Sequence, residues 1–276
     1  MKTRVISAAV LIAVSLLCIL LSPVTRVLFF AAAGILCVYE FSVSLEKLNV
    51  HCRLWVMVVY LLMQALFSLL HTGLFPYCAS FIACVYLALF SGVLRQRVSG
   101  NGALDTVAGL AYPCVLFAAL MVVSVSSIWL ETIVIATVCS WICDASALFG
   151  GMRFGKHPLA PAVSPKKTWE GAICGSAAAS VAGVLLWALG LLCAEMPWLG
   201  ALYSPLPLWL CVLTAFLSSS VGQIGDLAES LIKRMIGVKD FSDLIPGHGG
   251  MFDRADSLLF AIPTAYFCIR LAEPLL

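Results

Sequence analysis

Charged side chains are scarce in this sequence. Only 11% of its 276 residues are Asp, Glu, Lys or Arg, whereas 62% are hydrophobic. A soluble domain carries about 25% charged residues, so this chain has too few to cover its own surface in water. The scarcity excludes an ordinary soluble domain and indicates a protein whose solvent is lipid. The formal net charge of +2 likewise gives no reason to expect nucleic acid as a partner.

The cysteines lack the spacing of a metal or redox site. Most of the 12 lie inside apolar runs, and no C-x-x-C pair occurs. Cys139 and Cys143 are one helical turn apart, but no His or Cys completes a tetrahedral set. We therefore expect small hydrophobic side chains within helices, and no zinc.

The apolar runs predict an all-α polytopic membrane protein with about nine transmembrane helices. The predicted spans cover residues 5–21, 27–45, 54–70, 73–94, 107–126, 128–150, 171–194, 206–226 and 257–273. Pro76 and Pro113 interrupt the fourth and fifth. We expect one transmembrane domain over residues 1–276, with scaffold spans in 1–126 and catalytic spans with their cytoplasmic loops in 127–276.

The distribution of positive charge predicts the orientation. With a cytoplasmic N-terminus, every Lys and Arg except Arg26 and Arg270 faces the cytoplasm, as the positive-inside rule requires. The chain is then a multi-pass protein of the inner (cytoplasmic) membrane. Its two long polar connections, after the sixth and eighth spans, face the cytoplasm, and we expect the active site there.

The first polar block, residues 226–257, begins with Asp226 at the end of an apolar helix. A carboxylate at membrane depth costs about 2.5–3.5 kcal/mol. It is either a helix-end residue that reaches water or a functional group. Asp226, Glu229 and Lys233 share one helical stripe, which favours the functional interpretation.

The same block continues into a glycine-rich loop. Gly247, Gly249 and Gly250 surround His248, and such a loop can present backbone N–H groups to phosphate oxygens. His248 is either a hydrogen-bonding spacer or a phosphate contact. Beyond the loop, Asp253 and Asp256 lie one turn apart at the start of the last helix. Acids from two helices among several cations indicate Mg²⁺ and phosphoryl chemistry.

The second polar block, residues 144–171, carries Asp144 inside an apolar helix and a basic loop rich in Gly and Pro. The loop is either a lipid-headgroup contact or a wall of the site. Thr168 to Gly171 resembles a helix entry, and the small residues after Gly171 predict tight helix packing or a homodimer contact.

Together the blocks resemble the CDP-diacylglycerol synthase (phosphatidate cytidylyltransferase) family. The matching residues of the 226–257 block are Gly225-Asp226-Leu227-Ala228-Glu229, Ser230-Leu231-Ile232-Lys233-Arg234, Lys239-Asp240, Ser242, Pro246, His248-Gly249-Gly250 and Asp253-Arg254-Ala255-Asp256. The upstream segments F-G-K-H-x-L-A-P, from Phe154, and S-P-K-K-T-W-E-G, from Ser164, match too. The motif-bearing resemblance covers about residues 140–260. The family usually has a larger residue at Ala255, and a different pattern after Asp144.

The resemblance implies that phosphatidate and CTP give CDP-diacylglycerol and pyrophosphate, with Mg²⁺ and a K⁺ ion as cofactors. Asp226 and Asp253 are then the expected metal ligands. The expected catalytic residues are Lys233, Arg234, Lys239, Asp240, His248, Arg254 and Asp256. The expected substrate-binding residues are Asp144, Lys156, Ser164, Lys166, Lys167, Thr168, Glu170, Gly249 and Gly250.

Three other functions fit less well. A transporter or channel also uses intramembrane carboxylates, but here the polar residues gather at one face and no repeat relates the halves. A CDP-alcohol phosphotransferase has a D-G-x-x-A-R motif, which the chain lacks. A lipid-binding structural protein has no need of paired acids on two helices.

Overall fold

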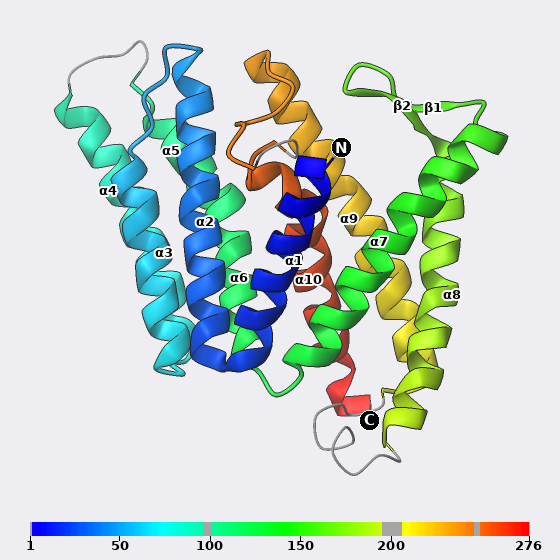
Figure 1. Cartoon of the computed structure of the whole chain (residues 1–276). Coiled ribbons are helices and arrows are strands. Elements are labelled where there is room, and N and C mark those ends of the chain that lie inside the picture. Colours follow the sequence, from blue (N-terminus) through cyan, green and yellow to red (C-terminus); the bar gives the residue numbers. More distant parts are fainter. Residues whose placement is uncertain (1, 96–100, 195–205, 246–248, 276) are drawn as a thin grey trace. The chain divides into compact units, whose positions relative to one another are not determined.

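The computed structural model describes residues 2–95, 101–194, 206–245 and 249–275. Its helices are α1 (Lys2–Leu21), α2 (Pro23–Glu46), α3 (Leu54–Leu69), α4 (Leu74–Leu94), α5 (Ala103–Gly109), α6 (Val115–Ser124), α7 (Trp129–Phe154), α8 (Trp169–Ala194), α9 (Leu208–Ile236) and α10 (Phe252–Ala272). A π-helical turn, Leu110–Cys114, joins α5 to α6, and a 3₁₀ turn, Glu273–Leu275, follows α10. Each of the nine predicted spans coincides with a helical segment among these residues (Figure 1).

Seven of these segments are long and apolar enough to cross a membrane, counting Ala103–Ser124 as one. The apolar part of α1 (Ala9–Leu21) and α3 are shorter. The chain is therefore a polytopic membrane protein. The eleven cysteines whose side chains the structure describes are free.

The chain divides into two compact units. The first comprises Met1–Ser126 and Lys233–Ala255, and the second Ser127–Ile232 and Asp256–Leu276. Helices α9 and α10 each contribute residues to both units.

Helix α2 forms the centre of the first unit and packs against α3 and α6. It begins at a capping box: Ser22 Oγ accepts from the Thr25 N–H, and Thr25 Oγ1 accepts from the Ser22 N–H. Pro23 at the first helical position costs no hydrogen bond there. Pro113 interrupts the fifth segment as predicted, and Tyr112 before it is extended (φ −150°, ψ 114°), because proline disfavours the helical conformation of the preceding residue.

Helices α7 and α8 lie side by side in the second unit (Figure 1). A Cβ on Gly171 would lie 2.6 Å from the Ala147 carbonyl oxygen, and one on Gly175 2.8 Å from that of Cys143. The predicted tight packing after Gly171 is therefore confirmed, since only glycine allows this approach.

Two local predictions differ from the structure. The loop between α7 and α8 contains an antiparallel hairpin of β1 (Pro158–Ala160) and β2 (Ser164–Thr168), so the described chain is not wholly α-helical. The predicted eighth span stops at Asp226, whereas α9 continues to Ile236 and so carries the predicted stripe of Asp226, Glu229 and Lys233. Hydropathy falls at Asp226, but the residues beyond it are mostly good helix formers. The helix ends where Gly237 takes a positive φ of 80°, the usual C-terminal device.

Candidate active site

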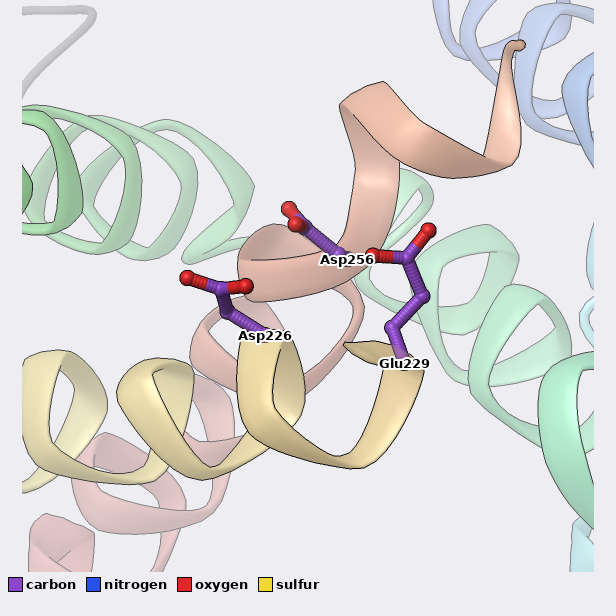
Figure 2. Close-up of side chains that lie close together, drawn as sticks. All are labelled: Asp226, Glu229 and Asp256. Carbon is purple, nitrogen blue, oxygen red and sulfur yellow. The ribbon is translucent and has the colours of Figure 1, made fainter. Parts of the chain in front are cut away.

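Three carboxylates of the second unit form an acidic cluster: Asp226 and Glu229 on α9, and Asp256 on α10. Oxygens of the three lie within 4.8 Å of one another. Glu229 is fully buried, and the other two are partly buried. Figure 2 shows Asp226 and Glu229 on adjacent turns of α9 beside Asp256.

The close approach of α9 and α10 explains why these acids meet. A Cβ on Gly225 would lie 2.6 Å from the Phe260 ring and 2.8 Å from the Asp256 carbonyl oxygen. One turn earlier, a Cβ on Gly222 would lie at an ordinary 3.4 Å from its nearest neighbour, the Ser257 carbonyl oxygen. The glycine beside Asp226 therefore allows its helix to reach the turn of α10 that carries Asp256.

The hairpin supplies a cation to the cluster. Lys167, in β2, donates from Nζ to Asp226 Oδ2 at 2.5 Å. Asp144, an exposed residue of α7, lies within electrostatic range of Asp226, Asp256 and Lys167. The structure therefore brings together the predicted substrate-binding residues Asp144 and Lys167 and the predicted metal ligand Asp226.

The donor chemistry of the cluster fits a hard divalent cation. Carboxylates that crowd together repel unless one is protonated or a cation lies between them. Oxygen ligands are those that Mg²⁺ and Ca²⁺ prefer, whereas zinc prefers nitrogen and sulfur. The cluster can thus hold a metal ion. Among the described residues it is the only group of three or more His, Cys, Asp or Glu with this geometry, and nothing supports a separate K⁺ site.

Glu170 and Thr168 stabilise the base of the hairpin. Glu170 Oε2 accepts from the backbone N–H groups of Lys156 and His157 at 3.1 and 3.2 Å, and Oε1 lies 2.6 Å from His157 Nδ1. Thr168 Oγ1 accepts from the Gly171 N–H at 3.2 Å, at the start of α8. The predicted helix entry at Thr168 to Gly171 is confirmed, because α8 begins at Trp169. Ser164 lies in β2, opposite Ala160, and Lys166 is exposed.

Asp253, in the first unit, is surrounded by donors. Its Oδ1 accepts from Lys233 Nζ at 2.9 Å, and its Oδ2 from the Phe241 and Gly250 N–H groups at 3.0 and 2.9 Å. Its side chain is only 2% exposed. Asp253 thereby ties the end of α9, the following loop and the first turn of α10 into one structure.

The remaining predicted residues of this unit are mostly at the surface. Arg234, Lys239, Asp240 and Arg254 are exposed. Gly249 has a φ of 82°, a backbone conformation that favours glycine. His248 lies outside the described residues.

Comparison with known proteins places the chain in a family. The model of the cytidylyltransferase family matches residues 2–272. The chain belongs to the cytidylyltransferase family. A phosphatidate cytidylyltransferase of Brucella abortus (biovar 1, strain 9-941) is 35% identical over 285 positions, which cover 99% of this chain and 95% of that protein.

Shorter matches join the chain to further proteins of the same name. The phosphatidate cytidylyltransferase of Bacillus subtilis (strain 168) is 41% identical over 137 residues, 49% of this chain and 46% of that protein. That of Mycobacterium tuberculosis (strain H37Rv) is 38% identical over 143 residues, 52% of this chain and 39% of that protein. The resemblance inferred from the two polar blocks is confirmed.

Sequence interpretation missed two acids that the structure makes prominent in this family member. Glu229 was noted on the helical stripe but given no role, although it is a member of the acidic cluster. Glu40, in the apolar helix α2, is 3% exposed and lies outside both polar blocks. A carboxylate inside an apolar run is itself a functional signal, so Glu40 was detectable. The expected pairing of Asp226 with Asp253 as metal ligands stays a prediction, because the two belong to different units.

Proposed function

We propose that this chain transfers the cytidylyl group of CTP to phosphatidate, giving CDP-diacylglycerol and pyrophosphate. The observation that carries the proposal is the similarity to a phosphatidate cytidylyltransferase over 99% of the chain. An acidic cluster with an adjacent lysine, in a polytopic membrane protein, agrees with a reaction between a nucleotide and a membrane lipid.

The reaction joins two anions. An oxygen of the phosphatidate phosphate attacks the α-phosphorus of CTP, a new P–O bond forms, and the bond to the β-phosphate oxygen breaks as pyrophosphate leaves. Phosphatidate is already anionic near neutral pH, so the chain needs no strong general base. The demands on the protein are alignment of the two phosphates and stabilisation of charge on the leaving group.

A divalent metal, expected to be Mg²⁺, would be held by Asp226, Glu229 and Asp256. The family resemblance also implies a metal-ligand role for Asp253, and that assignment stays a prediction. When bound, it would neutralise phosphate charge. Lys167, beside Asp226, would contact the same phosphates. The exposed cations Arg234, Lys239 and Arg254 would bind the triphosphate. The same proposal keeps Lys233, which pairs with Asp253, as a catalytic residue and the hairpin lysines as substrate-binding residues. The other predicted residues keep the roles that the family resemblance implies.

The membrane setting suits both substrates. CTP is cytosolic, so the site would face the cytoplasm, as the charge distribution predicts. Phosphatidate keeps its acyl chains in the bilayer and would enter at headgroup level. A homodimer contact through the small residues of α8 remains part of the proposal.

The test uses the purified full chain in phospholipid nanodiscs with radiolabelled CTP, phosphatidate and titrated Mg²⁺. We expect labelled CDP-diacylglycerol and stoichiometric pyrophosphate, and activity that disappears on chelation. A parallel reaction with dCTP measures the nucleotide preference. Protein that conducts ions but releases no pyrophosphate from CTP would support the transporter alternative and defeat this proposal.

A further inference from the structure

Glu40 is a buried carboxylate in the middle of an apolar helix. It lies in α2, whose sequence around it is ILCVYEFSVS, and is only 3% exposed. Burying a carboxylate without partners is costly. Its position therefore needs an explanation in the contacts that it makes.

Among the described residues, its hydrogen-bond partners come from a segment about 200 residues away in the chain. Glu40 Oε1 accepts from Ser242 Oγ at 2.6 Å and from the Met251 N–H at 3.0 Å. Its Oε2 accepts from the Phe252 N–H at 2.9 Å. Phe252 is the first residue of α10, so the carboxylate satisfies N–H groups at a helix N-terminus, where negative charge is favoured.

The same face of α2 holds this segment at two further points. Ser44, one turn beyond Glu40 and fully buried, donates from Oγ to the Phe241 carbonyl oxygen at 3.2 Å. Phe41 packs edge-on against Phe252, with ring centroids 6.5 Å apart, and the Phe241 ring lies 4.7 Å from that of Phe252. Phe252 is fully buried. Hydrogen bonds and aromatic packing thus fix both ends of residues 241–252 to one helix.

Gly250 of the family motif is explained by Glu40. A Cβ at this position would lie 2.6–2.8 Å from the Glu40 carboxylate atoms, so any larger residue would displace the acid. The Gly250 N–H itself donates to Asp253. Neighbouring backbone amides are therefore divided between two buried carboxylates, Asp253 and Glu40.

We propose that Glu40 is a positioning residue for cytidylyl transfer. It holds residues 241–245 and 249–252, and with them Asp253 and the turn that precedes Asp256, in the conformation that the reaction needs. This inference rests on the proposed function. The described hydrogen-bond partners of Glu40 are a serine hydroxyl and two backbone N–H groups. Glu40 therefore acts through the segment that carries them, and misplacement of reacting groups by about 1 Å is enough to cost about 100-fold in rate.

The first experiment compares Glu40→Gln with Glu46→Gln, a control at the exposed end of the same helix. A glutamine directs an NH₂ group at one or more of the donors that now face carboxylate oxygens. We expect kcat for CDP-diacylglycerol formation to fall about 10- to 100-fold in Glu40→Gln, while KM for phosphatidate stays within about threefold, because acyl chains supply most of a lipid's affinity. Glu46→Gln should match wild type.

Hydrogen–deuterium exchange on the same nanodisc samples gives a readout that needs no activity. Glu40→Gln should exchange faster in peptides covering residues 241–252, with no change in α7 and α8. An active wild type together with unchanged kcat in Glu40→Gln would overturn the positioning role. An inactive wild type would instead defeat the proposed function, and the exchange data would still decide whether Glu40 holds the segment.

A milder variant separates positioning from stability. Ser242→Ala removes one donor to Glu40 and should lower kcat about threefold without changing the thermal midpoint. The double variant Glu40→Gln with Gly250→Ala should have a kcat only slightly below that of Gly250→Ala alone, because both substitutions disturb the same contact. A lower thermal midpoint with normal kcat at low temperature would show a merely structural role and overturn the inference. Full additivity of the two losses of kcat would show that Glu40 and Gly250 act independently, and would overturn it too.

Discussion

Asp253 and Asp256 begin the same helix one turn apart, yet their surroundings are opposite. Asp253 accepts from one ammonium and two backbone N–H groups and is nearly inaccessible. Asp256 lies with two further acids, Asp226 and Glu229. A carboxylate whose oxygens accept hydrogen bonds from several donors stabilises the structure around it. Crowded carboxylates repel one another, and a bound cation relieves that repulsion. The comparison predicts that neutralising each will have a different effect.

The largest effect is expected at the acidic cluster. Asp226→Asn and Asp256→Asn should each lower turnover about 1000-fold, since a metal ion supplies several kcal/mol of charge stabilisation. The thermal midpoint should stay level or rise, because mutual repulsion among the acids falls. Initial rates and thermal unfolding of the same preparations check both. A variant with wild-type turnover would remove that residue from the proposed metal site.

Asp253→Asn should lose stability as well as activity. Removing the charge abolishes the ion pair with Lys233, which is nearly covered from water, and weakens two amide contacts. Such a change costs about 3–5 kcal/mol. Chemical denaturation measures the loss, and Asp243→Asn, at an exposed loop acid, is the matched control. If Asp253→Asn lost only activity and kept full stability, the structural side of the comparison would fail.

Gly225→Ala tests the helix approach that assembles the cluster. Its Cβ would overlap the Phe260 ring and the Asp256 carbonyl, so α9 and α10 must separate there. We expect turnover to fall about 10- to 100-fold through the displaced carboxylates. Gly222→Ala, with ordinary contacts at the same interface, should retain near wild-type rates. Equal effects of the two substitutions would argue against a specific role for Gly225.

Metal binding at the acidic cluster should stabilise the folded protein. At Mg²⁺ about tenfold above its dissociation constant, wild type should gain about 1.4 kcal/mol. Asp226→Asn should lose this gain. Thermal unfolding against Mg²⁺ concentration, with chelator as the reference, makes the measurement. Mg²⁺-dependent stabilisation that persists in Asp226→Asn would locate the metal elsewhere.

The smallest effect is expected at the hairpin. Glu170→Gln weakens its contacts to the Lys156 and His157 amides and to the His157 ring. These groups are exposed, so water replaces much of what is lost. We expect turnover to fall only about two- to fivefold, by looser placement of Lys167 beside Asp226. A loss as large as that of Asp226→Asn would indicate direct substrate contact by Glu170.

The spans were predictable because lipid imposes a local rule. In a helical membrane protein each stretch that crosses the bilayer is apolar and satisfies its own backbone groups, so hydropathy located nine helical segments among the described residues. The same rule could not find the end of α9, since a helix continues beyond the apolar region when its residues favour it. It also missed the hairpin, whose short strands have no strong pattern.

The chemical class of the site was predictable from a long motif, but its contacts were not. Asp226 and Asp256 were both singled out, yet their partnership with Glu229 was not. The sequence spacing of Glu229 gave only a shared stripe with Asp226. The position of α10 against that stripe depends on the contact between Gly225 and Phe260. Gly225 belongs to the motif, but nothing in the sequence indicates that Phe260 packs against it.

The sequence by itself determined the lipid environment, the helical segments and the family, because hydropathy and motif spacing are properties of neighbouring residues. Tertiary structure alone decided which acids face one another and which are covered by donors. Glu40 is the clearest case: its partners lie about 200 residues away. Only folding brings a carboxylate of α2 to the first amides of α10, where the unsatisfied N–H groups of a helix terminus need an acceptor.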